Sequence, residues 1–531
     1  MTYSGRRSSS GTVDINVAMA VHRNAHYHRD SVVIRYAGGD FTYGQLNDSA
    51  ARLATALTHG GVAHGDRVAY LGLNSAAFLV TLLGSLRIGA LFVPINHRLA
   101  PTEVLTVLER SGAVAAICEE GHRGVVDSVR DRTALKQFVL VDDDPLIAVD
   151  GDFPPGWERW SVALAAAAPT DHVAPAHFDE PAILMFTSGT TGRPKGVVLT
   201  HGNIWWNSIN VNERLDTRRG DTTLATAPLF HVGALNSFAI NTIARGGTVV
   251  VRRSFEPTQF LEDLLDHSVN SVFAVPAMFN ALGRVPDLPA ANLSHLRSVV
   301  VAGAPVSVSL IRRFADHGIW LQQAWGMTET SPFATHLPVE WTLEKIGSAG
   351  IAMPHTEVRV VDSATNQPLS AGWPGEIVVR GPNVTPGYWQ DPEATAAAFD
   401  DAGWFHSGDI GYLDDDGCLF IVDRLKDMII SGGENVYPAE IEGVLADLPG
   451  VTDVAVVGAP HPEWGETVVA VVSAAEEAVV TLEAVREHAA SKIARYKLPQ
   501  QLRIVAQLPR NATGKLDKHA LRALISAASP R

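Results

Sequence analysis

Short apolar runs alternate with amphipathic helical patterns along most of the chain. The run Arg67–Leu73 has the composition of a buried strand, and Ala76–Ile88 after it has helical spacing. Near-continuous apolar strands separated by helices indicate parallel sheets covered by helices. Further strands are expected at Val114–Cys118, Phe138–Val141, Ala182–Phe186, Thr248–Val251, Ser271–Val275 and Ser298–Val301, and further helices at Pro257–His267 and Val306–His317. We therefore predict an α/β fold with two helix-covered, mostly parallel sheets in the first two thirds of the chain.

The pattern changes in the last third. Strand-like runs separated by Gly/Pro turns, at Glu357–Asp362, Glu376–Arg380 and Cys418–Val422, predict a small β-rich module that closes the large domain. A compact α+β pattern follows, with helices at Pro438–Leu448 and Leu482–Ile493 and strands at Thr452–Val457, Thr467–Val472 and Leu502–Val505. We predict a large N-terminal domain over residues 1–423 and a mobile α+β C-terminal domain over residues 424–531.

Composition excludes several classes of protein. The chain has 531 residues, and its 57 acidic against 42 Lys and Arg side chains give a net charge of −15. That balance argues against a surface that coats nucleic acid. Its 2 cysteines exclude a disulfide scaffold or a Cys-rich zinc site. No apolar stretch reaches the roughly 20 residues that span a bilayer, and no targeting signal is evident, so we expect a cytoplasmic enzyme.

The strongest local signal is the segment Thr187–Gly196, TSGTTGRPKG, which follows the apolar strand Ala182–Phe186. Its glycines let backbone N–H groups turn toward an anion, and its hydroxyls add donors. Lys195 supplies a positive charge for a phosphate. The spacing differs from that of Walker A, in which the lysine directly follows the second glycine. The segment therefore predicts a phosphate-binding loop.

This segment resembles the signature loop of the adenylate-forming superfamily, which contains acyl- and aryl-CoA synthetases, adenylation domains of nonribosomal synthetases, and luciferases. Further matching segments follow in the family's order, so the resemblance covers most of the chain. It implies ATP-phosphate contacts from the residues of the loop and of the later segment QAWGMTET: Thr187, Ser188, Gly189, Thr190, Thr191, Gly192, Lys195 and Thr328. It also implies that Glu329 reaches Mg²⁺, which accepts one or two carboxylates plus phosphate oxygens. Taken alone, a Thr-Glu pair after a strand is more often a helix cap.

The resemblance also implies where the nucleoside binds. It assigns the adenine and ribose contacts to Gly303, Ala304, Pro305, Trp325, Gly326, Met327, Asp409 and Arg424. Asp409 would accept hydrogen bonds from the ribose hydroxyls, with Arg424 as its partner. Without that context, an Asp and an Arg near turns are equally consistent with an ordinary salt bridge.

The C-terminal segments complete the resemblance. Lys515, in PRNATGK, matches the lysine that stabilises charge during adenylation, and Lys426 matches the hinge of the domain rotation. Coenzyme A contacts are implied for Gly432, Gly433 and Trp464. Without the resemblance, a lone Lys near a C-terminus is usually solvated.

The segment Pro228–Ser237, PLFHVGALNS, resembles the lining of the acid pocket. The resemblance places His231 as a gate beside the carboxylate, with Val232, Gly233, Asn236 and Ala302 lining the pocket. Plant coumarate-type ligases carry a bulky aromatic residue at the position of Gly233, so we expect a wider pocket here. Amino-acid adenylation domains carry Asp where His231 stands, which argues against an α-amino acid substrate.

The resemblance implies ATP-dependent activation of an aryl, cinnamyl or medium-chain carboxylic acid as an acyl adenylate, followed by transfer to coenzyme A. ATP, Mg²⁺ and coenzyme A are the implied cofactors. Two alternatives stay open: transfer to a separate carrier protein, and activation of another nucleophile, including nitrite toward an aryl amine. A nucleotide-binding protein without catalysis is disfavoured, because Lys195, Glu329, Asp409 and Lys515 are all present. The sequence leaves open whether the chain forms a homodimer.

Overall fold

The computed structural model describes residues 14–147, 153–187, 194–304, 306–431, 434–461, 465–476, 478–490, 492–511 and 515–527. By their contacts, these described residues divide into two compact units. The first lies within Met1–Ile346, Ala352–Glu357 and Arg380–Phe399, and the second within Gly347–Ile351, Val358–Val379 and Asp400–Arg531.

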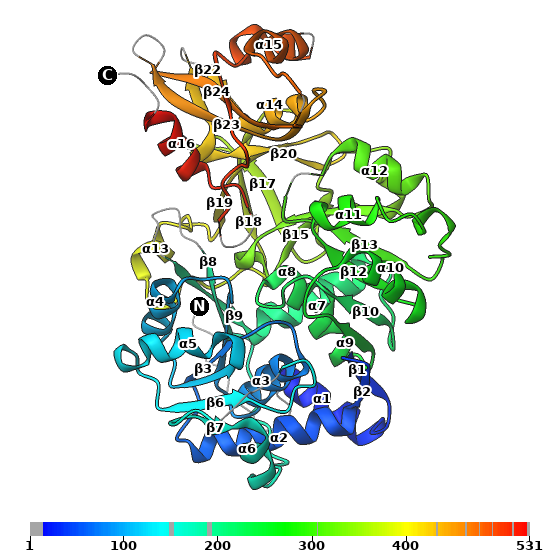
Figure 1. The fold of residues 1–531 in the computed structure, drawn as a ribbon, viewed down its shortest axis with the longest axis vertical. Coiled ribbons are helices and arrows are strands. Elements are labelled where there is room, and N and C mark those ends of the chain that lie inside the picture. The colour runs from blue at the N-terminus through cyan, green and yellow to red at the C-terminus, as the bar shows by residue number, and fades with distance from the viewer. Residues whose placement is uncertain are drawn as a thin grey trace, which may run out of the picture. The chain divides into compact units, whose positions relative to one another are not determined.

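The first unit is built on two largely parallel sheets, as the alternating pattern predicts (Figure 1). One has the strand order β7 (Glu158–Arg159), β6 (Gln137–Val141), β5 (Ala115–Glu119), β3 (Arg67–Leu71), β4 (Leu91–Ile95), β8 (Pro181–Thr187) and β9 (Lys195–Thr200). The other has the order β16 (Ile351–Ala352), β15 (Phe333–His336), β14 (Leu321–Gly326), β13 (Ser298–Val301), β12 (Ser271–Ala274), β10 (Thr222–Ala225), β11 (Thr248–Val251), β1 (Val32–Tyr36) and β2 (Gly39–Thr42). Antiparallel pairs occur between β8 and β9, β14 and β15, and β1 and β2.

Helices and short helical turns connect these strands. They are α1 (Val17–Tyr27), α2 (Tyr43–His59), α3 (Ala76–Arg87), α4 (Pro101–Ser111), α5 (Glu120–Val129), η1 (Arg130–Arg132), α6 (Trp160–Ala166), α7 (His201–Arg214), α8 (Val232–Ala234), η2 (Leu235–Ala239), α9 (Ile240–Ala244), α10 (Pro257–Asp266), α11 (Pro276–Leu282), η3 (Leu288–Ala290), α12 (Val308–Ala315), η4 (Thr328–Thr330), η5 (Val339–Trp341) and α13 (Pro392–Ala396).

Local sequence explains where these helices begin. Helix α3 is buried along its whole length, and Ser75 caps it by accepting a hydrogen bond from the Phe78 N–H. Helix α12 is shorter than the sequence predicts, because Ser307 accepts a hydrogen bond from the Leu310 N–H and so forms its N-cap. Apolar side chains from α3 and from strands of both sheets share one buried core, which fixes the strand ends that carry the candidate site.

The second unit contains a sheet with strand order β17 (Glu357–Val361), β18 (Gly375–Arg380), β19 (Phe405–Leu413) and β20 (Leu419–Arg424), in which β18–β19 and β19–β20 are antiparallel pairs. A second sheet has the order β22 (Glu434–Val436), β21 (Ile429–Ser431), β24 (Gly465–Ala474) and β23 (Val451–His461), and β25 (Gln501–Ile504) pairs with β24. The helical elements of this unit are η6 (Leu425–Asp427), α14 (Pro438–Leu445), α15 (Leu482–Ala490), η7 (Arg495–Lys497) and α16 (Lys518–Ala527).

The sheet β17–β20 groups with a different part of the chain than the sequence predicts. It was expected to close the large domain, but its contacts group it with the C-terminal segments. The buried Asp423 at the end of β20 gives a physical reason, because its Oδ2 accepts a 2.8 Å hydrogen bond from the Ala439 N–H in the first turn of α14. The boundary at residue 423/424 stays a prediction.

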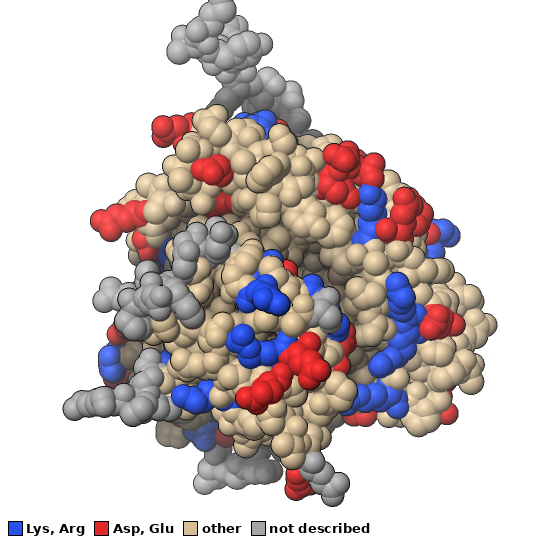
Figure 2. All heavy atoms as spheres, turned by 90° about the horizontal axis from the view of Figure 1, so that it is seen from above, with Lys and Arg blue, Asp and Glu red and all other residues tan. Residues whose placement is uncertain are grey.

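Charged side chains of both signs are scattered over the face shown in Figure 2, among a larger uncharged surface. No field of Lys and Arg dominates this face, in keeping with the net charge of −15. Among the helices that the structure describes, none is long and apolar enough to cross a membrane.

Candidate active site

The ends of the predicted phosphate loop form an antiparallel hairpin. Thr187 ends β8, Lys195 begins β9, and the two residues lie opposite each other in the pairing register. The hairpin therefore holds the two ends of the loop side by side, with the lysine at its base. The loop residues between them, Ser188, Gly189, Thr190, Thr191 and Gly192, lie outside the described residues.

Lys195 and Glu329 both contact one tyrosine, which the sequence analysis did not single out. The Tyr388 hydroxyl donates a 3.0 Å hydrogen bond to Glu329 Oε1. On the same ring, the Lys195 Nζ lies 4.6 Å from the centroid, within the range of a cation–π interaction. Burial raises the pKa of Tyr388, and the neighbouring charge of Glu329 raises it further, so the phenol remains a protonated donor.

Glu329 itself is buried in the short turn η4. The segment around Tyr388 holds this turn: the Thr385 N–H donates a 2.7 Å hydrogen bond to the Glu329 carbonyl. The Asn383 side chain donates to the carbonyls of Thr330 at 2.8 Å and Phe333 at 3.0 Å. Glu329 is therefore fixed by several contacts from a segment more than fifty residues further along the chain. The predicted phosphate ligand Thr328 opens the same turn and is partly buried.

The predicted adenine-binding turn follows strand β13. Ala302 is buried, whereas Gly303 and Ala304 are exposed, and Pro305 lies outside the described residues. Gly303 has a φ of +88°, a left-handed conformation that favours glycine. A flat base therefore meets little side-chain obstruction at this turn.

Trp325 and Gly326 end strand β14, which pairs in parallel with β13, and Met327 follows directly. Trp325 is buried and Met327 is partly buried. Gly326 cannot carry a side chain without displacing the Pro332 carbonyl. The carboxyl ends of β13 and β14 thus present both predicted nucleoside-contacting segments at one sheet edge, where open α/β sheets bind ligands.

The predicted acid-pocket segment covers α8 and the π-helical turn η2. His231 precedes α8 as its N-cap residue, with its ring centroid 4.4 Å from that of Phe230. Val232 and Asn236 are buried, and Asn236 donates a hydrogen bond to the Ser331 carbonyl. That bond links the pocket segment to the residue that follows η4.

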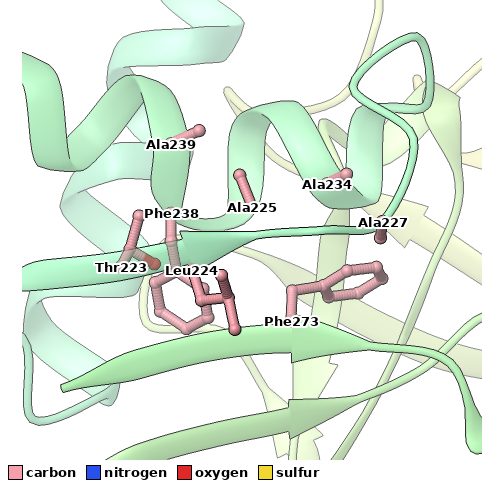
Figure 3. A pocket seen from close by; sticks show the side chains of 8 residues that line it. All are labelled: Thr223, Leu224, Ala225, Ala227, Ala234, Phe238, Ala239 and Phe273. Carbon is pink, nitrogen blue, oxygen red and sulfur yellow. The ribbon is translucent and has the colours of Figure 1, made fainter. Parts of the chain in front are cut away.

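A small cavity of about 10 Å³ lies beside this segment (Figure 3). The expected widening by Gly233 does not occur in this structure, because the Phe273 ring fills the space: a Cβ on Gly233 would lie 2.6 Å from Phe273 Cζ. The cavity is lined by Thr223, Leu224, Ala225, Ala227, Ala234, Phe238, Ala239 and Phe273.

The second unit brings together three of the predicted catalytic and ribose-binding residues. Asp409 on β19 lies opposite Arg424 on β20, and Arg424 Nε is 3.3 Å from Asp409 Oδ1. The charges of both residues act on Lys515. Desolvation of its ammonium group and repulsion by Arg424 lower the pKa of Lys515, while attraction to Asp409 raises it. Lys515 as a residue is exposed, whereas its ammonium group is desolvated.

The predicted hinge and coenzyme A residues are described only in part. Lys426 lies in η6, directly after β20, and desolvation followed by repulsion from Arg424 lowers its pKa. Gly432, Gly433 and Trp464 lie outside the described residues.

The donor set suits magnesium bound together with substrate phosphates. Within the described part of the chain, no cluster of three or more His, Cys, Asp or Glu side chains forms a protein-only metal site. Glu329 is a buried carboxylate that shares Tyr388 with Lys195, at the base of the predicted phosphate loop. One carboxylate there matches the preference of Mg²⁺, which keeps several waters and binds phosphate oxygens.

Comparison with family models identifies the chain. The model described as "AMP-binding enzyme" matches residues 21–389, and "AMP-binding enzyme C-terminal domain" matches residues 440–515. The chain belongs to the AMP-binding enzyme family. The two matches leave residues 390–439 between them, which include the predicted boundary and hinge.

Named relatives of this AMP-binding enzyme match over nearly its whole length. It is 41% identical over 500 residues to a feruloyl-CoA synthase of Amycolatopsis sp, covering 94% of this chain and 97% of the relative. It is 38% identical over 510 residues to an indoleacetate–CoA ligase of Aromatoleum aromaticum, covering 95% of this chain and 97% of the relative. The structure of o-succinylbenzoate coenzyme A synthetase from Bacillus subtilis, in complex with ATP and magnesium, matches with a TM-score of 0.84 at 29% identity, covering 96% of this chain and 99% of the other.

Proposed function

We propose that this enzyme activates a carboxylic acid with ATP as an acyl adenylate and then transfers the acyl group to coenzyme A, releasing AMP. The observation that carries the proposal is the cluster of Lys195, Tyr388 and Glu329 at the base of the phosphate loop. It lies within the stretch that matches the AMP-binding family. Named CoA ligases among the relatives support the same reaction class.

In the first step, a carboxylate oxygen attacks the α-phosphorus of ATP and pyrophosphate leaves. This displacement depends on positioning and on neutralising charge. We assign Lys195 to the phosphates, and Lys515 to the charge that develops as the acyl phosphate forms. His231 positions the attacking carboxylate. Glu329 would hold Mg²⁺, which supplies Lewis-acid neutralisation of the phosphate oxygens when bound.

Within the first unit, we assign the adenine contacts to the two glycine-containing segments that lie at the carboxyl ends of β13 and β14. Within the second unit, we assign Asp409 to accept hydrogen bonds from the ribose hydroxyls, while its ion pair with Arg424 at 3.3 Å orients the carboxylate. The ordinary salt bridge and the ribose contact are therefore compatible, because a carboxylate can accept several hydrogen bonds.

The acid is aromatic or of medium length. The buried cluster beside the pocket segment is apolar, with Phe238, Phe333 and Met353 among its members. The relatives named for feruloyl and indoleacetyl substrates support an aromatic acid. The absence of Asp at the position of His231 argues against an α-amino acid.

The second step uses the thiol of coenzyme A, which attacks the adenylate carbonyl so that AMP leaves. We assign Lys426 as the hinge of the rotation between the two steps, with the lid extending over residues 424–531, and Gly432, Gly433 and Trp464 as coenzyme A contacts. Proline at position 426 would fix φ near −65°. Lys426→Pro should therefore slow thioester formation while leaving adenylation largely intact. We place the enzyme in the cytoplasm, where ATP and coenzyme A are both present.

Identification of the acyl acceptor by mass spectrometry tests this proposal. Purified enzyme receives ATP, Mg²⁺ and a panel of acids including ferulate, cinnamate, benzoate and octanoate, with coenzyme A or with pantetheine as acceptor. An acyl-CoA product with one AMP released per thioester supports the proposal. Adenylation without any acyl-CoA would instead indicate transfer to a carrier protein, and AMP release that requires nitrite and an aryl amine would indicate the nitrite reaction.

A further inference from the structure

The cavity beside the acid-pocket segment is too small for any acid. Its volume of about 10 Å³ is comparable to the space that one water needs. Ligand pockets are usually several hundred Å³. Since the cavity lies between β10, β12, α8 and η2 (Figure 3), an acid that enters here requires one of the lining side chains to move.

The lining side chains differ in their freedom to move. Ala225, Ala227, Ala234 and Ala239 are too short to open or close a pocket. Leu224 and Phe238 are large but only 2% exposed, and each packs in a separate buried cluster. Phe273 packs against two buried clusters, but among the lining residues that the structure describes it alone combines a large side chain with partial exposure.

The Phe273 ring is directed at Gly233. A Cβ on Gly233 would lie 2.6 Å from Cζ, 3.0 Å from Cε1 and 3.3 Å from Cε2 of this ring. Gly233 is absent from the glycines with positive φ, so its backbone does not require glycine. The missing side chain at position 233 therefore makes room for the ring of Phe273.

The Phe273 ring also has an aromatic neighbour in Phe333. Its centroid lies 6.5 Å from that of Phe333, with the planes tilted by 48°. Beyond the ring, several alanines line the cavity instead of larger apolar residues. If the ring turns away or is shortened, the space that it now fills beside Gly233 is added to this small cavity.

Resting on the function proposed above, we propose that Phe273 is a specificity-determining residue that forms the movable inner wall of the acid pocket. Its ring closes the space beside Gly233 and sets the length of the acid that the enzyme accepts. The ring of Phe273, on β12, occupies the space that a side chain at position 233 would otherwise fill.

Acid length preference in Phe273 variants tests this proposal. The readout is kcat/KM for acid-dependent ATP–pyrophosphate exchange with benzoate, cinnamate, octanoate and dodecanoate. Phe273→Ala should raise the ratio of kcat/KM for dodecanoate to that for benzoate by about 10-fold or more. This is the effect expected when one or more methylene groups of the acid become buried in a pocket. Phe273→Leu should shift the ratio in the same direction by less, and its similar volume preserves the packing.

A double-mutant cycle tests the contact between Phe273 and Gly233. Gly233→Ala in the wild type forces the ring out of place and should lower kcat/KM for all four acids. In the Phe273→Ala background the added methyl group has room, so the loss should largely disappear. Equal losses in both backgrounds would contradict the contact as the reason for glycine.

Phe255→Ala is the matched control, because Phe255 is also partly buried but packs against Phe260, outside the cavity lining. It should leave the length ratio unchanged, and thermal unfolding confirms that each variant is folded. If the wild type is active but folded Phe273→Ala and Phe273→Leu keep its length ratio, this inference is overturned and the proposed function is not. A wild type without exchange for any acid overturns the proposed function, and this inference with it.

Discussion

The hydroxyl of Tyr388 donates a 3.0 Å hydrogen bond to the carboxylate of Glu329, from a position 59 residues further along the chain. The same ring receives the Lys195 ammonium on its face, 4.6 Å from the centroid. One tyrosine therefore contacts both a cation and an anion. We infer that this arrangement orients the lysine toward its assigned phosphate and the carboxylate toward its assigned Mg²⁺.

Tyr388→Phe should weaken the use of Mg·ATP. The substitution keeps the ring under Lys195 but removes the donor to Glu329, and a hydrogen bond to a charged group contributes about 1.5–3 kcal/mol. We expect KM for Mg·ATP in pyrophosphate exchange to rise about 10-fold or more. Tyr27→Phe, on a tyrosine that is 74% exposed, is the control. An unchanged magnesium and ATP dependence in folded Tyr388→Phe would contradict the role of this bond.

Lys515→Ala should reduce adenylation about 10²- to 10³-fold, the usual cost of losing a charge that stabilises the transition state. Thioester formation from a supplied acyl adenylate should continue at a similar rate. Lys136→Ala, at an exposed lysine, should affect neither step. Equal loss of both steps would show that Lys515 does not act specifically in adenylation.

The pH dependence of adenylation provides a separate test of Lys515. Its pKa is lowered, chiefly by desolvation, so the ammonium loses its proton at a lower pH than an ordinary lysine. Activity should therefore decline on the alkaline side earlier than for an unperturbed lysine. In Lys515→Arg the guanidinium stays charged, so the alkaline decline should move to higher pH. A decline at the same pH in both enzymes would assign it to another group.

Asp409→Asn should have two effects. The neutral amide loses the ion pair with Arg424 and accepts more weakly from the ribose, so KM for ATP should rise about 10-fold. Asp409 also raises the pKa of Lys515, so its removal should move the alkaline decline of adenylation to still lower pH. Asp401→Asn, at an exposed position, is the control. A rise in KM without any shift in the pH profile would contradict the electrostatic coupling of Asp409 to Lys515.

Asn383→Ala should destabilise the first unit. Asn383 is fully buried, and its amide donates to the carbonyls of Thr330 and Phe333 while its Oδ1 accepts from the Thr356 hydroxyl. Leaving such groups unpaired costs about 1–3 kcal/mol each, so we expect a clear drop in the unfolding temperature. The exposed Gln507→Ala serves as the comparison. A wild-type unfolding temperature in Asn383→Ala would show that water or neighbouring groups replace these bonds.

The sequence predicts the strands and the family closely because both depend on local pattern. The expected strands Thr248–Val251 and Ser298–Val301 coincide with β11 and β13, since buried β-branched runs bounded by turns have one favourable conformation. Helix ends were less accurate. The end expected at Leu448 lies at Leu445 in the structure, because apolar spacing continues beyond the last helical turn.

Tertiary relationships could not be read from the sequence. Nothing in the local pattern around Tyr388 indicates that its hydroxyl reaches Glu329, because that contact depends on how the segment packs against β9. The same holds for Phe273, whose ring fills the space beside Gly233 from another strand. A small residue in a predicted pocket therefore indicates space only after its neighbours are known.

The central claim is that the enzyme forms an acyl adenylate, and acid-dependent exchange of labelled pyrophosphate into ATP measures that step most directly. We predict exchange that requires Mg²⁺ and an aromatic or medium-chain acid, and that falls about 10²-fold or more in Lys515→Ala. Absence of exchange across the whole acid panel, with folded wild-type enzyme and Mg·ATP present, would contradict the account.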